Sequence, residues 1–258
     1  LADFAAAIID PTTSPGIAKS GMLRSTDNIH FAPKGARACG AALAAALSGR
    51  VKTGNVLAVS ATDCVGINAS NTQQLDNPLL LATGSAVYPA TNGYLNGSTN
   101  ANIAAAWELL TSGSPSVTPT LVARTDGMGN SQRLSITSTT ASDQTNYRNR
   151  SSIAGRFSAG DVIRGQVKLS ISSASALTGI KVWWAVTVAG TTTYSLHAIN
   201  SSLYTFDQTN FTDFVFTTPD FVVPTGALTS SYFTIRTTYS GAGGCTLDIS
   251  QPTLRKLT

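Results

Sequence analysis

Strict alternation of apolar and polar residues is the feature that most constrains the fold of this chain. In four stretches, residues 161–171, 179–188, 233–239 and 245–250, every second position is apolar over most of the length. Successive side chains on a β-strand point to opposite faces, so each stretch is predicted to be a strand with one face in a core and the other outside it. Four half-buried strands are most simply accommodated by a jelly-roll-like sandwich of two antiparallel sheets.

The composition agrees with this prediction and excludes several classes of protein. Charged residues make up 12% of the 258 positions, about half of the ~25% usual in soluble domains, and coiled coils or long-helix proteins need far more. The net charge of +4 comes from 17 basic residues that form no run, so no nucleic-acid partner is expected. No stretch reaches the ~18 apolar residues of a membrane span, and no membrane insertion is expected.

The three cysteines, Cys39, Cys64 and Cys245, are widely separated and form no C-x-x-C pair. We therefore predict small buried residues rather than a zinc site or a disulfide framework. The glycine-rich stretch 126–130 contains one carboxylate, too few for a calcium cage, and is predicted to be a hairpin turn. No metal and no cofactor are expected.

The first fifty residues differ from the rest of the chain. Residues 1–9 are rich in Ala and residues 36–47 in Ala and Leu, and both are predicted helices, the second one starting near Pro33 or Lys34. We expect three parts: 1–50, a connector over 51–76 with a short strand at 56–59, and a sandwich over 77–258. The chain starts with Leu, as expected of a fragment or a processed product. One face of the second helix is predicted to comprise Ala36, Cys39, Gly40, Leu43, Ala44 and Leu47.

An acidic residue and a histidine lie close together before the second helix. Asp27 precedes His30 by three residues, with Gly35 and the Ala-rich helix following. In a tight turn this spacing lets the Asp27 carboxylate accept a hydrogen bond from the His30 ring, which leaves the other ring nitrogen free as a general base. An Asp-capped loop without catalytic meaning is the alternative.

This block resembles the last conserved block of SGNH (GDSL-type) hydrolases, in which such an Asp and His precede the terminal helix of an α/β/α domain. The resemblance implies that residues 1–50 are the C-terminal piece of that domain, with Asp27 orienting and His30 acting as base in serine esterase or deacetylase chemistry. The family's G-D-S nucleophile block is absent, since Gly160-Asp161-Val162 lacks the serine. Without a nucleophile we expect the chain by itself to be inactive.

Trp183 and Trp184 are adjacent in a predicted strand, so if Trp184 faces the core, Trp183 faces outward with Lys181. An outward Trp requires a partner. One candidate is a sugar ring, because an aromatic face stacks on the C–H surface of a pyranose. The others are a neighbouring subunit, because large aromatic side chains are enriched in interfaces, and plain packing within the chain. Tyr232 and Arg236 lie on the outer phase of another strand and have the same interpretations. Trp107 is predicted to be a packing anchor.

The order of these parts resembles the C-terminal region of bacteriophage tail spikes and tail fibres, in which an SGNH hydrolase is followed by a sandwich similar to a carbohydrate-binding module. The segments that carry the resemblance are 77–80, 122–134, 159–165 and 248–256. It implies a homotrimer on the virion, in contact with other tail proteins and with a host surface polysaccharide, a capsule or lipopolysaccharide.

The leading hypothesis is therefore a receptor-binding segment that recognises a host glycan. One alternative is part of an esterase acting on surface polysaccharide, and a second is a purely structural fibre tip.

Overall fold

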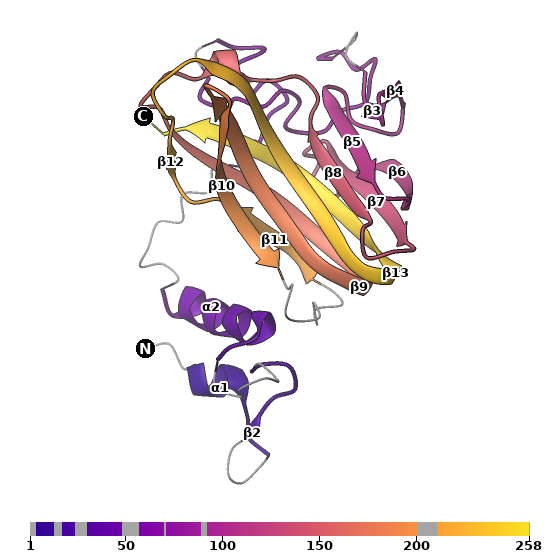
Figure 1. Ribbon diagram of the computed structural model, residues 1–258, viewed down its shortest axis with the longest axis vertical. Coiled ribbons are helices and arrows are strands. Elements are labelled where there is room, and N and C mark those ends of the chain that lie inside the picture. The colour runs from indigo at the N-terminus through magenta and orange to yellow at the C-terminus, as the bar shows by residue number, and fades with distance from the viewer. Residues whose placement is uncertain are drawn as a thin grey trace. The chain divides into compact units, whose positions relative to one another are not determined.

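The computed structural model describes residues 4–12, 17–23, 30–47, 57–69, 71–88, 92–200 and 211–257. These fall into two compact units, divided near residue 55. The smaller unit lies in the first 55 residues, and the larger one holds the described residues from 57 to the C-terminal region (Figure 1). No helix in the described parts of the chain is long and apolar enough to cross a membrane.

The smaller unit contains two helices and a two-stranded sheet. Its elements are α1 (Phe4–Ile8), β1 (Ile9–Asp10), β2 (Ile17–Ala18) and α2 (Pro33–Leu47). The first predicted helix ends one residue earlier than expected, because Ile9 pairs with Ala18 in an antiparallel ladder. α2 confirms the second predicted helix, including its start near Pro33, a proline whose fixed φ suits the first helical turn.

The predicted face of α2 is partly exposed among the described residues. Cys39 is buried, whereas Leu43 on the same face is 45% exposed. The sequence predicts that this face packs on something larger than the first fifty residues, and this stays a prediction. Gly35 is buried, and a Cβ there would overlap the carbonyl oxygen of Met22. Glycine at this position therefore has a packing reason, since it lets α2 approach the preceding segment.

The larger unit is mainly β. Its elements are β3 (Tyr94–Leu95), β4 (Ser98–Thr99), β5 (Trp107–Ser112), β6 (Ser116–Ala123), β7 (Asn130–Ser138), β8 (Gln144–Asn149), a short 3-10 helix (Ala154–Arg156), β9 (Val162–Val188), β10 (Thr191–Asn200), β11 (Phe211–Thr217), β12 (Phe221–Val222) and β13 (Leu228–Lys256). The predicted turn at 126–130 is confirmed: β6 and β7 form a hairpin around it, with Arg124 N–H donating to the Gly129 carbonyl.

The two long strands β9 and β13 run antiparallel side by side and belong to both layers of a curled sheet (Figure 1). Their register shifts between Tyr239 and Gly244, and Ser173 and Ala176 in β9 have positive φ. On either side of these irregularities, β9 and β13 pair with different strands. One layer has the order β10-β9-β13-β8-β5-β3-β4, whereas β11 and β12 pair with the first part of β9, and β7 with the last part of β13. This curled sheet is consistent with the predicted β-sandwich, but its two layers are parts of one continuous sheet rather than the two separate sheets that we expected.

The predicted strand faces are confirmed. Ile180, Val182, Trp184 and Val186 are all buried, and so are the corresponding apolar residues of the other three stretches. The Trp184 indole N–H donates to Ser231 Oγ at 2.7 Å, as a buried indole requires. The cysteines Cys39, Cys64 and Cys245 are free and buried, as predicted.

Residues 57–76, which we expected to be a connector, pack against the C-terminal strand. Gln73 Oε1 accepts the Leu254 N–H at 2.8 Å, and Asp63 forms an ion pair with Arg255. The described part of the short strand predicted at 56–59 is not a strand, because its backbone groups bond to side chains: the Ala58 carbonyl accepts from Gln251 Nε2 at 2.7 Å.

Trp107 is a packing anchor, as predicted. It is fully buried, and its ring is stacked on Tyr147 with centroids 5.0 Å apart and planes 5° from parallel. Its indole N–H is 3.2 Å from the carbonyl oxygens of Asp76 and Asn77. The segment before β3 is thereby fixed to the sheet.

The opposite orientation of Trp183 and Trp184 generates a stability prediction. Trp184→Ala removes a ring that is 1% exposed, and should lower the free energy of unfolding by about 3–5 kcal/mol. Trp183→Ala, its matched control, removes a partly buried ring and should cost about 1 kcal/mol or less. Denaturant unfolding of both variants measures the difference; equal losses would contradict the assigned faces.

Asp143, in the turn before β8, is a fully buried carboxylate. Hydrogen bonds from the backbone N–H groups of Thr139, Ser114 and Thr140 hold the pKa of Asp143 well below its ordinary value of 3.8. Because the folded state favours the ionised form, this carboxylate stabilises the fold above pH 3.8, and the stabilisation is lost as the pH falls below that value.

We therefore expect Asp143→Asn to lower the free energy of unfolding at neutral pH and to make it less sensitive to acid below pH 3.8. Urea unfolding at stepwise lower pH measures this. Asp213→Asn is the control, because that side chain is 62% exposed. A variant at 143 with the acid sensitivity of the wild type would contradict the assignment.

Candidate functional site

A hollow of about 390 Å³ lies on the outer face of the layer that contains β10, β9, β13, β8 and β5. Three of the residues predicted from the sequence line it: Trp183 from β9 and Tyr232 and Arg236 from β13. The fourth, Lys181, lies directly opposite Arg236 in the β9–β13 register and shares its face. The structure therefore brings all four predicted residues together.

Local sequence explains why the sheet is hollowed here. Next to Trp183 on the same face of β9 come the small side chains of Ala185 and Thr187, which leave space between the larger residues of the neighbouring strands. Thr187 Oγ1 bonds to the hydroxyls of Thr192 and Ser230, both at 2.9 Å. Hydroxyl groups thus border one end of the hollow.

Each arginine of the hollow lies over an aromatic ring. The Arg236 guanidinium is 4.8 Å from the centre of the Trp183 ring, and that of Arg148, on β8, is 4.3 Å from the centre of the Tyr232 ring. Such cation–π contacts fix the planes of the guanidinium groups. They also cover one side of Trp183, so this ring is less open to a ligand than its outward orientation predicted.

The two arginines differ in their polar partners. Arg148 Nε donates to Glu108 Oε1 at 2.6 Å and is neutralised by it. Arg236 Nε donates to the neutral amide oxygen of Asn146, also at 2.6 Å. Burial lowers the pKa of Arg236, and the neighbouring Tyr194 raises it.

Tyr194, on β10, is the aromatic residue of the hollow that the sequence interpretation missed. Its side chain is 59% exposed, and it pairs with Ala185 of β9. The signal was present in the sequence: a two-residue hairpin at Ala189-Gly190, both with positive φ, fixes the β9–β10 register. Counting residues outward from that turn along both strands pairs Tyr194 with Ala185 and so places it on the same face as Trp183.

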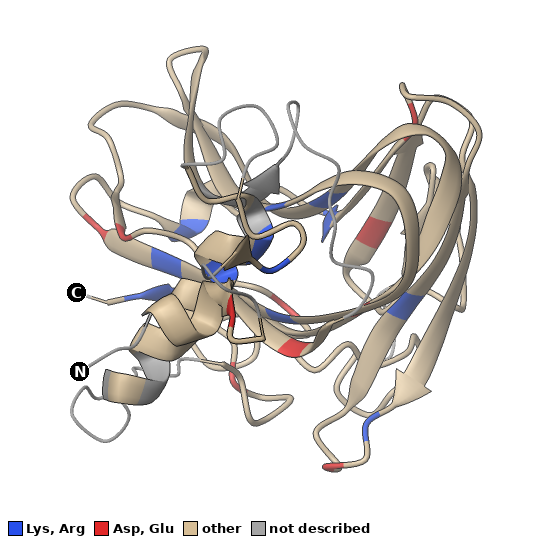
Figure 2. Cartoon of the chain, turned by 90° about the horizontal axis from the view of Figure 1, so that it is seen from below, with Lys and Arg blue, Asp and Glu red and all other residues tan. Residues whose placement is uncertain are grey.

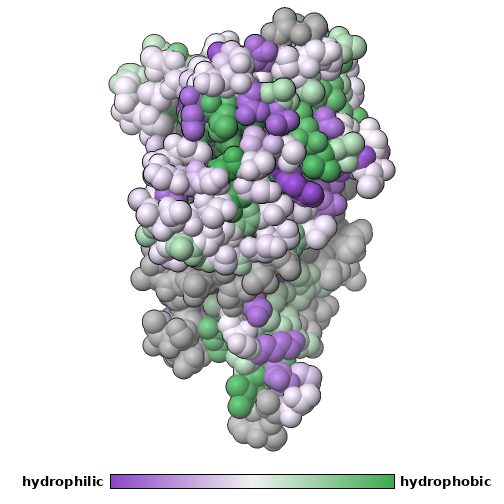
Figure 3. Space-filling model, turned by 90° about the vertical axis from the view of Figure 1, so that its right-hand side faces the viewer, coloured by the Kyte–Doolittle hydropathy of each residue, from purple (hydrophilic) through white to green (hydrophobic). Residues whose placement is uncertain are grey.

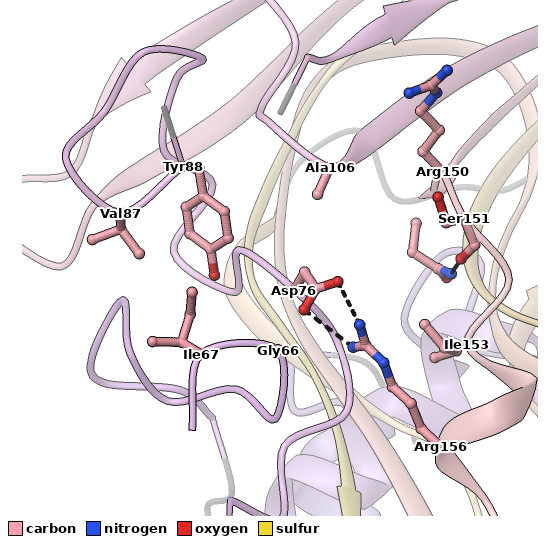
Figure 4. A pocket seen from close by; sticks show the side chains of 11 residues that line it. Gly66, Ile67, Asp76, Val87, Tyr88, Ala106, Arg150, Ser151, Ile153 and Arg156 are labelled. Atoms are coloured by element: carbon pink, nitrogen blue, oxygen red, sulfur yellow. Dashed lines mark hydrogen bonds and ion pairs between the residues drawn. The ribbon is translucent and has the colours of Figure 1, made fainter. Parts of the chain in front are cut away.

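A second hollow, of about 440 Å³, lies beside an ion pair between Asp76 and Arg156, whose nearest atoms are 2.7 Å apart (Figure 4). Gly66 lines this hollow, and glycine is required there because a Cβ would overlap the Asp76 carboxylate. The hydroxyl of Tyr88 accepts the Asn77 N–H at 2.7 Å and lies 3.2 Å from Cys64 Sγ, and burial raises the pKa of this tyrosine. These polar groups bond to one another, which is typical of a structural site.

The predicted catalytic residues belong to the smaller unit. His30 is exposed in the segment that precedes α2, and Asp27 lies outside the described residues. His197 lies in β10, with its side chain likewise outside the described part. Among the residues that the structure describes, no three His, Cys, Asp or Glu side chains form a cluster that could hold a metal ion.

Comparisons with known proteins give matches to solved structures alone. No family model matches the sequence, and no curated protein matches it. The enzymatically active domain of tailspike protein 4 from bacteriophage CBA120 is 17% identical with a TM-score of 0.40, over 59% of this chain and 19% of the tailspike chain. A structure of carbohydrate-binding modules of the β-sandwich superfamily is 10% identical with a TM-score of 0.41, over 57% of each chain.

The family 11 carbohydrate-binding module of a cellulosomal cellulase from Clostridium thermocellum is 15% identical with a TM-score of 0.34, over 58% of this chain and 87% of that module. The part of the tailspike that aligns with this chain is less than a fifth of the tailspike's length.

The topology of this protein defines its class: it is a β-sandwich with an aromatic and basic hollow on one outer face.

Proposed function

We propose that the protein binds a polysaccharide in the hollow formed by β10, β9, β13 and β8. One observation carries the proposal: Tyr194, Trp183 and Tyr232 gather on a single outward face with Arg148 and Arg236 between them. Binding sites for small polar ligands typically combine aromatic walls with a few fixed polar groups. An aromatic ring stacks on the apolar C–H face of a sugar, and guanidinium and hydroxyl groups can bond to its hydroxyls.

The outside of the protein has a mixed polarity. Hydrophilic and hydrophobic residues are interspersed over the face shown in Figure 3. Residues of both charge signs occur along the strands in Figure 2. Among the described residues of the hollow, the most exposed ring is that of Tyr194, which we assign as the stacking platform.

The resemblance of the sequence to phage tail spikes and fibres suggests the biological setting. We propose a receptor-binding segment on the virion, assembled as a homotrimer with other tail proteins, that recognises a capsule or lipopolysaccharide of the host. The low charge content and the abundance of Ser and Thr support an extracellular β assembly of this kind.

The stacking role of Tyr194 is tested on an array of bacterial surface polysaccharides. Tyr194→Ala should weaken binding of the full chain about tenfold, because aromatic stacking contributes on the order of 1 kcal/mol or more. Val222→Ala is the matched control, since both side chains are 59% exposed and Val222 lies on β12. An unchanged affinity of Tyr194→Ala for the polysaccharide would contradict the assignment of Tyr194 as the stacking platform.

The molar mass of the same variant separates glycan binding from a contact between subunits. If the face binds sugar, Tyr194→Ala keeps the oligomeric state of the wild type in light scattering. Dissociation into monomers would instead assign the face to a subunit interface and contradict the proposal.

Ester hydrolysis by the smaller unit is a second candidate function. It is favoured by the position of His30, which is exposed close to the N-terminus of α2, with Asp27 three residues before it. In the intact tail protein we expect His30→Ala to lower esterase activity about 10²–10⁴-fold, as for loss of a general base. Circular dichroism controls for folding; retained activity in a folded variant would exclude His30 as the base.

A further inference from the structure

We propose that the hollow is selective for polysaccharides that carry anionic groups, and that Arg236 and Lys181 are the residues that recognise the anion. This inference rests on the proposed function, glycan binding at the same face. It adds the chemical class of the ligand, which neither the aromatic residues nor the hydroxyl groups of the hollow specify.

The distribution of ion pairs in the sandwich unit singles out these two cations. Most Lys and Arg residues of the unit lie within 4.0 Å of an acid, in the pairs Arg124–Asp126, Arg133–Asp248, Arg148–Glu108, Arg156–Asp76, Arg164–Asp220, Lys168–Asp213, Arg255–Asp63 and Lys256–Asp161. Within the described residues the exceptions are Arg150, Lys181 and Arg236. Two of these three therefore lie on the face of the hollow.

Lys181 and Arg236 are direct neighbours on that face. They are opposite each other in the antiparallel ladder of β9 and β13, and adjacent strands are about 4.7–4.9 Å apart. Like charges directly opposite each other destabilise a sheet. An anion bound between the two side chains would remove this repulsion, whereas a neutral sugar would not.

The surroundings of Arg236 hold its guanidinium ready for an anion. The ring of Trp183 lies beneath it at 4.8 Å, and its Nε donates to Asn146 Oδ1 at 2.6 Å. No hydrogen bond joins its two terminal nitrogens to a described residue. A guanidinium with both terminal N–H groups free can bind a carboxylate, sulfate or phosphate in a bidentate manner.

Glu108 does not neutralise Lys181 or Arg236. It is 8% exposed and bonds to Arg148 at 2.6 Å. The Arg148–Glu108 pair is neutral as a unit, so the positive charge of the face comes from Lys181 and Arg236. The ligand that this arrangement fits is a glycan with uronic acid carboxylates, or with sulfate or phosphate substituents.

The full chain is tested on immobilised polysaccharides of known charge. Hyaluronan, alginate and polygalacturonate carry carboxylates, dextran sulfate carries sulfate, phosphomannan carries phosphate, and dextran and galactomannan are neutral. We expect binding to one anionic group of probes, which identifies the anion, and weaker binding as NaCl is raised. For a carboxylate probe, reduction of its carboxyl groups to alcohols should lower the affinity at least about tenfold.

Two variants assign the effect to the hollow. Arg236→Gln should lower the affinity for the anionic probe at least about tenfold and leave that for its reduced form within about twofold. Lys181→Gln removes a side chain without an ion pair among the described residues, so it serves as a second variant if Arg236→Gln is unfolded. Arg133→Gln is the control, because it removes one positive charge on the other layer, where Arg133 is paired with Asp248 at 2.8 Å.

The remaining outcomes contradict either the anion selectivity alone or glycan binding as a whole. Equal binding of the anionic and the reduced probe, or equal losses for both in Arg236→Gln, would overturn the anion selectivity and leave glycan binding in place. Binding to the neutral probes alone would do the same. Binding to no probe by the folded wild-type chain would contradict the proposed function, and with it this inference.

Discussion

The pairing of β9 with β13 is the interaction on which the rest of the structure depends. The two strands form a ladder over most of residues 162–188 and 228–256, and every other strand of the sandwich except β3 to β6 bonds directly to one of them. Backbone bonds of this kind are worth little individually, but their loss inside a core is costly. The bends near 173–176 and 239–244 let one pair of strands supply the centre of both layers.

The geometry of the candidate binding face follows from this ladder. Its register places Lys181 opposite Arg236 and Trp183 opposite Thr234, and the hairpin into β10 adds Tyr194 to the same face. The alternate residues of the same strands, among them Val182, Trp184 and Ile235, point inward and are buried in the core. A rigid core behind the hollow keeps the guanidinium groups and rings at fixed positions, which reduces the entropy cost of binding.

Alternation of apolar and polar residues is sufficient to predict the two faces of a strand, but not the contacts of an irregular segment. Alternation predicted the burial of Trp184 and the outward direction of Trp183 correctly, because a strand allows only two side-chain directions. It gave no information on residues 57–76, whose contacts with the C-terminal strand are made by side chains such as Gln73 and Arg255 across more than 180 positions. The helical period over 36–47 predicted the second helix, but it does not say what covers the exposed Leu43 on its apolar face.

The sequence by itself determined the class of fold, the inner and outer sets of residues on the main strands, and the candidates Trp183, Lys181, Tyr232 and Arg236. These depend on local rules, namely the two-residue period of strands and the exclusion of charge from a core. Only the tertiary structure decided which outer residues meet, because that depends on the register between strands distant in sequence. It placed Arg236 over Trp183, neutralised Arg148 with Glu108, and left Lys181 and Arg236 side by side.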